Sequence, residues 1–129
     1  MKVALFTAAL LLGGLAFGQQ PLSKTTRTVS PRTELTPDQK ALNLTNKMIT
    51  DLGLSGEQTS QISEVNLGIA TKNHNVRTNA SYTAETINQI IQGNNEARKS
   101  MYKNILTTEQ YSLFESLEST NAAYQISAL

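Results

Sequence analysis

Hydrophobic residues recur at helical spacing along most of the chain after residue 35, and no segment shows the sustained apolar–polar alternation of a half-buried strand. Gly53 follows the first stripe in the position of a glycine that ends a helix. The pattern predicts a helix over about residues 36–52 with this stripe facing the core. The first stripe consists of Leu42, Thr45, Met48, Ile49 and Leu52.

A second predicted helix follows residue 55 and fades in the polar segment 78–81, where we expect the chain to reverse. Its apolar residues are Ile62, Val65, Ile69 and Val76.

The clearest stripe starts after Ala84 and predicts a third helix. A stripe at helical spacing usually faces the core, which we expect here, and the alternative is a surface that binds a partner. Gly93 interrupts it, and a glycine costs a helix about 1 kcal/mol relative to alanine. Either one helix or two short ones would fit, but the stripe keeps its phase across Gly93 and therefore favours one helix with a weak point. The third stripe is Ile87, Ile90, Ile91, Ala97, Met101 and Ile105.

A last helix is predicted from Tyr111, Phe114, Leu117 and Tyr124.

The same short string occurs three times, at residues 35–39, 54–58 and 106–110: Leu, a hydroxyl residue, any residue, an acid and Gln. The hydroxyl group can cap a helix by accepting from a backbone N–H of the first turn, and the Gln can reach back to the N–H of the capping residue. The acid lies in the first turn, where the helix dipole favours negative charge. The three strings therefore predict helix starts capped by Thr36, Ser55 and Thr107.

The N-terminal segment has the layout of a secretory signal peptide. Lys2 is followed by an uncharged apolar run, Val3–Phe17, and by the small residue Gly18 at the predicted cleavage point. The run of about 15 residues is shorter than the roughly 20 needed to span a membrane. We expect cleavage after Gly18, a periplasmic product without stable membrane insertion, a disordered leader over residues 19–34 and a helical domain over residues 35–129.

Composition removes several classes of function. The chain has no cysteine, which excludes a lipid-anchored lipoprotein, disulfides and thiolate metal sites. Removal of residues 1–18 deletes only Lys2 among the charged residues and leaves equal numbers of basic and acidic side chains. A neutral chain is not expected to bind nucleic acid or an anionic membrane. The absence of Trp and the few aromatic residues favour an open helical layer over a closed bundle.

Candidate catalytic and metal-binding residues are sparse. His74 is the only histidine, and a metal site there would need further ligands that could only be carboxylates. A surface histidine is the favoured interpretation. The acidic residues are scattered, and no pair lies in an apolar setting that would suit acid–base chemistry. We expect no enzyme activity, no catalytic residue, no metal site and no cofactor.

The second and third strings begin 52 residues apart. In this arrangement the chain resembles the Spy/CpxP family of periplasmic proteins, which carry two LTxxQ motifs at similar spacing. The matching positions are Leu54, Ser55, Gln58, Leu106, Thr107 and Gln110, and the resemblance covers about residues 38–118. Ser55 replaces the threonine of the first motif, and the neutral charge departs from the basic character of the best-known chaperone of the family.

The resemblance implies an all-α protein of about four helices with a long antiparallel helical hairpin, which pairs as a homodimer into an open cradle. It implies an ATP-independent holdase that binds unfolded or misfolded polypeptides in envelope stress. The alternative is a modulator of envelope-stress signalling, metal-responsive or not, that docks on a membrane sensor protein. Exposed candidates for polypeptide binding lie off the predicted core phase, and Met101 joins them because its thioether adapts to varied partners. The candidates are Leu67, Tyr82, Met101, Tyr102 and Leu113.

Overall fold

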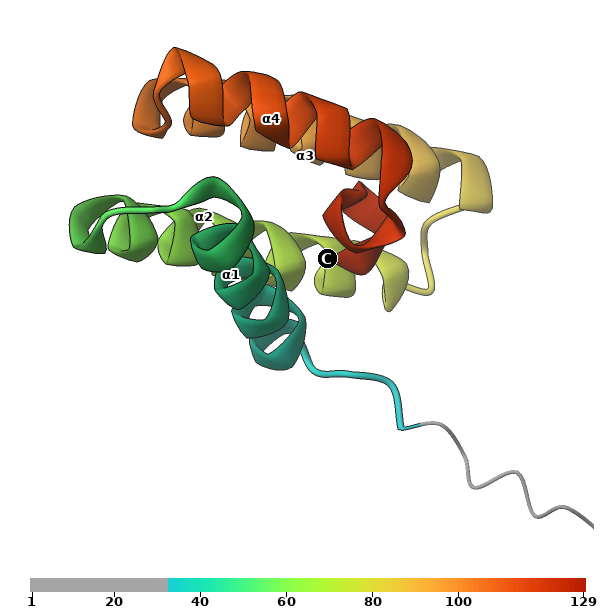
Figure 1. Cartoon of the computed structure of the whole chain (residues 1–129). Helices are drawn as coiled ribbons and strands as arrows, with labels where there is room; N and C mark the ends of the chain where they lie inside the picture. Colours follow the sequence, from blue (N-terminus) through green and yellow to red (C-terminus); the bar gives the residue numbers. More distant parts are fainter. Residues whose placement is uncertain (1–32) are drawn as a thin grey trace, which may run out of the picture. The chain divides into compact units, whose positions relative to one another are not determined.

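The computed structural model describes residues 33–129, which contain four α-helices, two short 3-10 helices and no strand. The prediction of an all-helical protein with four helices is confirmed. The predicted signal peptide (1–18) and nearly all of the predicted leader (19–34) lie outside the described residues. The helices are α1 (Pro37–Leu52), α2 (Gly56–Arg77), α3 (Ala84–Ile105), α4 (Thr108–Thr120), η1 (Ala122–Tyr124) and η2 (Ile126–Ala128), as Figure 1 shows.

All three predicted capping boxes are formed. At the start of α1, Thr36 Oγ1 accepts from the Gln39 N–H at 3.3 Å, and Gln39 Oε1 accepts from the Thr36 N–H at 2.9 Å. Because these pairs satisfy backbone donors that a helix N-terminus otherwise leaves open, they fix where the helices begin. The equivalent pairs are Ser55 with Gln58 at α2 and Thr107 with Gln110 at α4.

The ends of the helices agree with the sequence at α1 and α3 and differ at α4. Gly53 ends α1 with φ +65°, a left-handed conformation that favours glycine, and α3 continues through Gly93 as one helix. The last helix was predicted to reach Tyr124 but ends at Thr120. Asn121 is extended there (φ −128°), and its side chain accepts from the Ala123 N–H, which starts η1 instead.

The core face of α3 differs from the prediction, and that of α1 differs only in part. On α1, Thr45, Met48 and Leu52 are buried as predicted, but Leu42 is 58% exposed. On α3, none of the six residues of the third stripe is fully buried, because the buried positions lie one residue away, about 100° around the helix. The buried residues of α1 are Ala41, Leu44, Thr45, Met48 and Leu52, and those of α3 are Arg98 and Tyr102.

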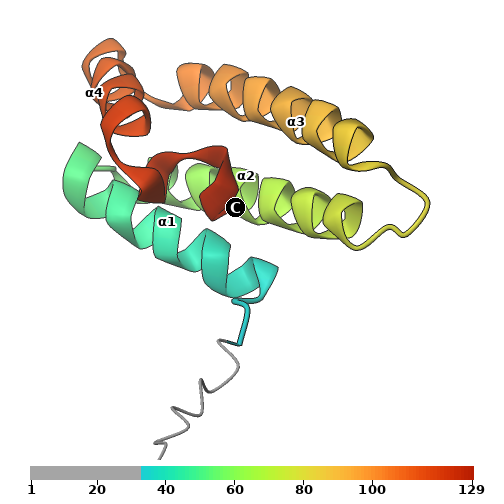
Figure 2. The ribbon, with the colours of Figure 1, turned by 90° about the vertical axis from the view of Figure 1, so that its right-hand side faces the viewer.

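The described helices lie in two layers. α1 packs mainly against α2, and α2 packs against α3, to which residues 78–83 connect it. In Figures 1 and 2, α1 and α2 lie on one side and α3 and α4 on the other, and the segment with η1 and η2 (dark red) lies between them. The core is therefore shared by every element of residues 33–129.

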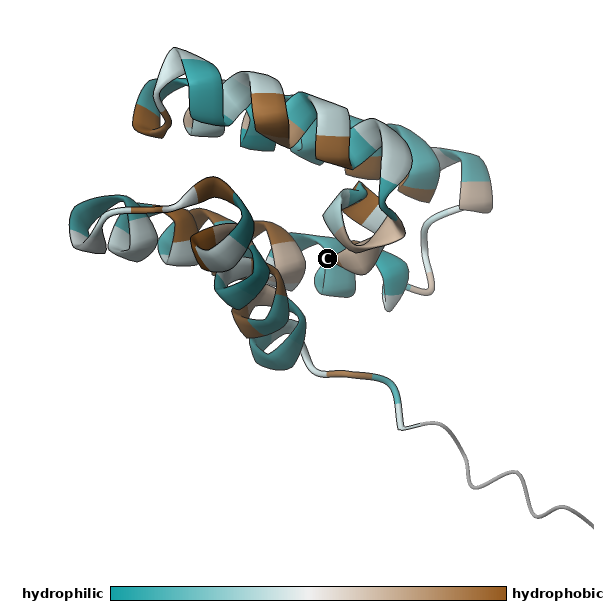
Figure 3. Cartoon of the chain, in the orientation of Figure 1, coloured by the Kyte–Doolittle hydropathy of each residue, from teal (hydrophilic) through white to brown (hydrophobic). Residues whose placement is uncertain are grey.

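Each helix carries both hydrophobic and hydrophilic residues along its length (Figure 3). Such helices bury one face and expose the other. Within residues 33–129, no helix has the length and apolar character needed to cross a membrane.

Candidate functional site

The side chains of Gln58 and Gln110 bond to each other across 52 residues of chain, and we call them the glutamine pair. Gln58 Nε2 donates to Gln110 Oε1 at 2.7 Å, and Gln110 Nε2 donates to Gln58 Oε1 at 3.2 Å. Each amide also donates to a carbonyl at the opposite turn, Gln58 to Ile105 O at 3.1 Å and Gln110 to Leu52 O at 3.2 Å. The glutamine pair therefore ties the turn between α1 and α2 to the turn between α3 and α4.

The remaining residues of the second and third strings are also used in structure. Leu106 is buried in the core, and the half-buried Leu54 packs against this core. The hydroxyl groups of Ser55 and Thr107 cap α2 and α4. The two strings thus form the turns at the starts of α2 and α4 and the contact between these turns.

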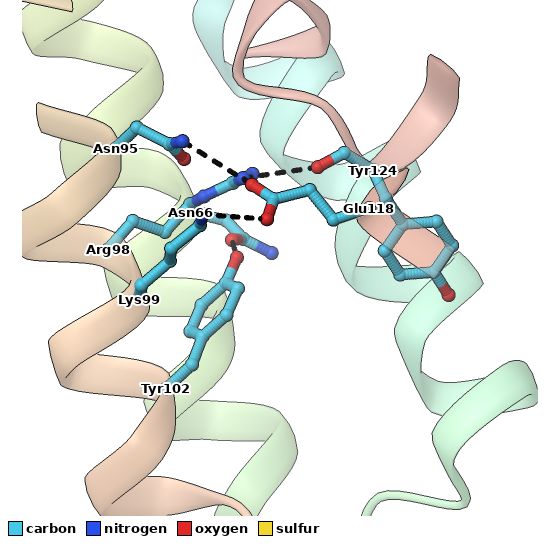
Figure 4. A network of polar contacts seen from close by, with 7 residues as sticks. All are labelled: Asn66, Asn95, Arg98, Lys99, Tyr102, Glu118 and Tyr124. Atoms are coloured by element: carbon cyan, nitrogen blue, oxygen red, sulfur yellow. Dashed lines mark hydrogen bonds and ion pairs between the residues drawn. The ribbon is translucent and has the colours of Figure 1, made fainter. Parts of the chain in front are cut away.

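Arg98 is fully buried and lies at the centre of a polar network (Figure 4). Its Nη2 donates to Glu118 Oε1 at 2.8 Å and to Tyr124 O at 3.1 Å. The guanidinium also lies 5.7 Å from the ring centroid of Tyr102 and 5.5 Å from that of Phe114, within the range of cation–π attraction. Its Nε and Nη1 have no hydrogen-bond partner among the described residues. Glu118 and the two rings are the groups that offset the cost of burying the charge.

The carboxylate of Glu118 accepts hydrogen bonds from several donors at the edge of this network. Lys99 Nζ lies 2.9 Å from Glu118 Oε2, and Asn95 Nδ2 donates to Glu118 Oε1 at 3.4 Å. The bond to Glu118 raises the pKa of Lys99. The carboxylate of Glu118 thus serves two cations, one of them without any solvent contact.

Tyr102 was predicted to be exposed, and this prediction is wrong. Its side chain is fully buried, and its hydroxyl bonds to Asn66 Oδ1 on α2. Asn66 Nδ2 donates in turn to Thr45 Oγ1 on α1 at 2.9 Å. Tyr102 was expected to be exposed because it lies off the predicted core phase, but the core face of α3 passes through it, and its hydrogen bond to a buried asparagine makes burial favourable.

We expect the free energy of unfolding to fall as the pH rises above 10. Burial raises the pKa of Tyr102 above its ordinary value of 10.0, so the phenol ionises in the unfolded chain first. Below the pKa that the phenol has in the unfolded chain, the contribution of Tyr102 to the free energy of unfolding is complete. Above that pKa, the contribution falls by about 1.4 kcal/mol per pH unit. Urea unfolding at a series of pH values should show this loss. Tyr102→Phe should lessen the pH dependence, whereas Tyr82→Phe, at an exposed position, should not; equal slopes would contradict the assignment.

A shallow apolar groove of about 280 Å³ lies between α2 and α3. Gly68 is among its lining residues, and a Cβ at this position would meet no atom within 4 Å. No other part of residues 33–129 therefore covers the groove at Gly68. Its lining residues are Glu64, Val65, Gly68, Ile69, Lys72 and Met101.

Four of the five predicted polypeptide-binding residues are exposed, by 38–44%. Met101 lines the groove, and the other three lie on α2, on the turn before α3 and on α4. The structure thus distributes them over several elements and brings only Met101 to the groove. These exposed residues are Leu67, Tyr82, Met101 and Leu113.

His74 is exposed on α2, and residues 33–129 contain no group of three histidine or acidic side chains placed to hold a metal ion.

The sequence interpretation missed the buried polar residues of the network. Asn66 and Asn73 lie on the same face of α2 as the predicted core residues Ile62 and Ile69, and both are fully buried. Asn94 Nδ2 on α3 donates to Asn73 Oδ1 at 2.8 Å. Polar residues in phase with an apolar stripe were the signal that could have revealed this network.

Comparisons with known proteins match the chain to one family model. No curated protein and no solved structure matches the chain. The model of one family, DUF4890, described as a domain of unknown function, matches residues 20–114. Because this match covers well over half of the chain, the protein belongs to the DUF4890 family.

Proposed function

We propose that this protein is a periplasmic, ATP-independent holdase that binds unfolded or misfolded polypeptides in envelope stress and has no enzyme activity. The observation that carries the proposal is apolar surface that residues 33–129 do not cover themselves. The groove between α2 and α3 is largely apolar, and Met101 at its edge is 38% exposed. Leu67 on α2 is 41% exposed.

Half-buried apolar residues extend this surface along α3. Most residues of the third stripe keep part of their side chain open to solvent, and of these Ile105 also packs against the core. Apolar contact stabilises a complex by about 25 cal/mol for each Å² removed from water, before entropy costs. Several partly open side chains therefore favour weak, releasable binding of many polypeptides. The half-buried residues are Ile87, Ile90, Ile91, Ala97 and Ile105.

The proposal includes an assembly. In it, α2 and α3 act as a long antiparallel hairpin, and two copies pair into an open cradle whose apolar side holds the polypeptide. The predicted signal peptide supports export. Analytical ultracentrifugation of the chain from Gln19 onward should give a dimer, and a monomer across the working concentrations would remove this part of the proposal.

Suppression of aggregation tests the function. The chain from Gln19 onward should keep a chemically denatured client soluble on dilution without ATP, and Leu67→Asp with Met101→Asp should weaken this effect. Losing about 1 kcal/mol of contact per side chain corresponds to about a fivefold higher concentration for half-suppression at each position. Light scattering measures the effect.

Leu42→Asp is the matched control, since Leu42 is exposed on α1, whereas Leu67 and Met101 lie on α2 and α3, the two helices that line the groove. It should leave suppression unchanged. No suppression by the unsubstituted protein over a panel of clients would contradict the proposal. Recovery of one stoichiometric membrane partner from envelope extract, without bound unfolded proteins, would favour the signalling alternative.

A further inference from the structure

The segment Asn121–Leu129 lies between the two helical layers like a bound peptide (Figures 1 and 2). It has no α-helix and consists of two 3-10 turns. Tyr124 and Leu129 are fully buried, Ile126 is half-buried, and Gln125 and Ser127 between them are exposed. Three anchor side chains, at the first, third and sixth positions from Tyr124, therefore hold the segment in the core.

The surrounding helices hold the main chain of this segment through arginine side chains. Arg98 of α3 donates to Tyr124 O at 3.1 Å, and Arg77 of α2 donates to Leu129 O at 3.2 Å. Every residue carries such a main-chain acceptor, so these contacts accept many sequences. The hydroxyl of Tyr124 adds a specific contact, since it donates to Asp51 Oδ2 of α1 at 2.8 Å.

The segment is open to solvent on one side. A surface recess of about 480 Å³ lies beside Ile126 and Ser127 and extends to Asn95, Lys99 and Glu118. Asn95 Oδ1 is buried without a hydrogen-bond partner among the described residues. A solvent-exposed side and an unpaired buried acceptor both reduce the stability of a packed segment. A segment held in this way is easier to displace than a close-packed helix.

We propose that α1–α4 form a second polypeptide-binding site, which residues 121–129 occupy as an internal competitor. The site takes a segment in a turn conformation with an aromatic anchor and aliphatic anchors two and five positions later. This inference rests on the proposed function, since it concerns the same class of partner, and it adds a site that opens when the internal segment leaves. An incoming polypeptide and residues 121–129 exclude each other.

A labelled peptide with the sequence of residues 121–129 tests the site by fluorescence anisotropy. The apparent affinity of a blocked site is lowered in proportion to the fraction of molecules in which it is open. Tyr124→Ala in the chain from Gln19 onward should therefore bind the peptide at least about tenfold more tightly than the unsubstituted chain. Gln125→Ala is the matched control, because Gln125 is exposed, and it should change nothing. A peptide with alanine in place of tyrosine should bind poorly to either chain.

Equal peptide binding by the Tyr124→Ala and Gln125→Ala chains, or none by a Tyr124→Ala chain with native helix content, would overturn the inference. Hydrogen exchange of the unsubstituted protein decides the matter if Tyr124→Ala does not fold. The amides of Tyr124, Gln125 and Leu129 should then exchange through a local opening, faster than the slowest amides of α2. Exchange only with global unfolding would overturn the inference.

The two proposals fail in different ways. Suppressed aggregation without peptide exchange removes only the internal competitor. Peptide exchange without suppressed aggregation removes the holdase and leaves the site between the layers in place.

Discussion

Glu118→Gln is expected to lower the free energy of unfolding by about 3 kcal/mol or more. The substitution keeps the size of the side chain but leaves the guanidinium of Arg98 buried with no opposite charge. Its remaining hydrogen-bond acceptors are then neutral, and an uncompensated buried charge is strongly destabilising. Urea unfolding near neutral pH, with the slope checked for constancy, measures the change.

Arg98→Met should be much milder, with a loss of about 1 kcal/mol. Methionine can pack against the rings of Tyr102 and Phe114, which contact each other directly. Glu118, whose side chain is 15% exposed, retains Lys99 as a partner. The double variant should resemble Arg98→Met alone, since it contains no unpaired buried charge. Glu115→Gln, at an exposed position on the same helix, is the control and should have little effect. A larger loss for Arg98→Met than for Glu118→Gln would refute this account of the network.

Gln58→Glu is expected to destabilise the domain by about 3 kcal/mol, although glutamate suits a capping box as well as glutamine does. A carboxylate can still accept from the Ser55 N–H, but it cannot donate to Ile105 O or to Gln110 Oε1. Its charge would also face the oxygen of Gln110. Ile105 O would lose the Gln58 donor, and Gln110 Oε1 would keep only the Thr107 N–H.

Gln39→Glu in the first capping box is the matched control. Gln39 reaches only the N–H of Thr36 and is exposed, so this variant should differ from the unsubstituted protein by no more than about 0.5 kcal/mol. Thermal and urea unfolding of both variants give the comparison. Similar losses at the two positions would mean that the glutamine pair adds nothing beyond capping. Combined alanine substitutions at Gln58 and Gln110 should cost less than the sum of the single ones, because they remove the same contacts.

The sequence predicted the helices well because their starts and ends depend on neighbouring residues. Thr36, Ser55 and Thr107 each cap a helix through residues three positions away. Gly53 likewise ends α1 through its own backbone conformation. Such local interactions appear in the sequence as short patterns.

The orientation of α3 was harder to predict, because hydropathy alone placed the wrong face of this helix in the core. The core face of α3 carries Arg98 and Tyr102, whose burial depends on Glu118 and Asn66 from other helices. Hydrogen bonds and ion pairs between distant residues can make a polar side chain a core residue, and no periodicity reveals the partner. The glutamine pair was hidden for a related reason, since each glutamine already had a complete local role as a helix cap.

The glutamine pair also constrains how the length of the chain can change. α2 and α3 have 22 residues each, residues 78–83 connect them at one end, and the bonds from Gln58 to Ile105 O and Gln110 join them at the other. An insertion of two helical turns in α2 alone would move these atoms about 11 Å out of reach, at 1.5 Å per residue. Tolerated insertions and deletions should therefore come in matched pairs, equal in both helices, so that the domain lengthens or shortens as one unit while its corner remains closed.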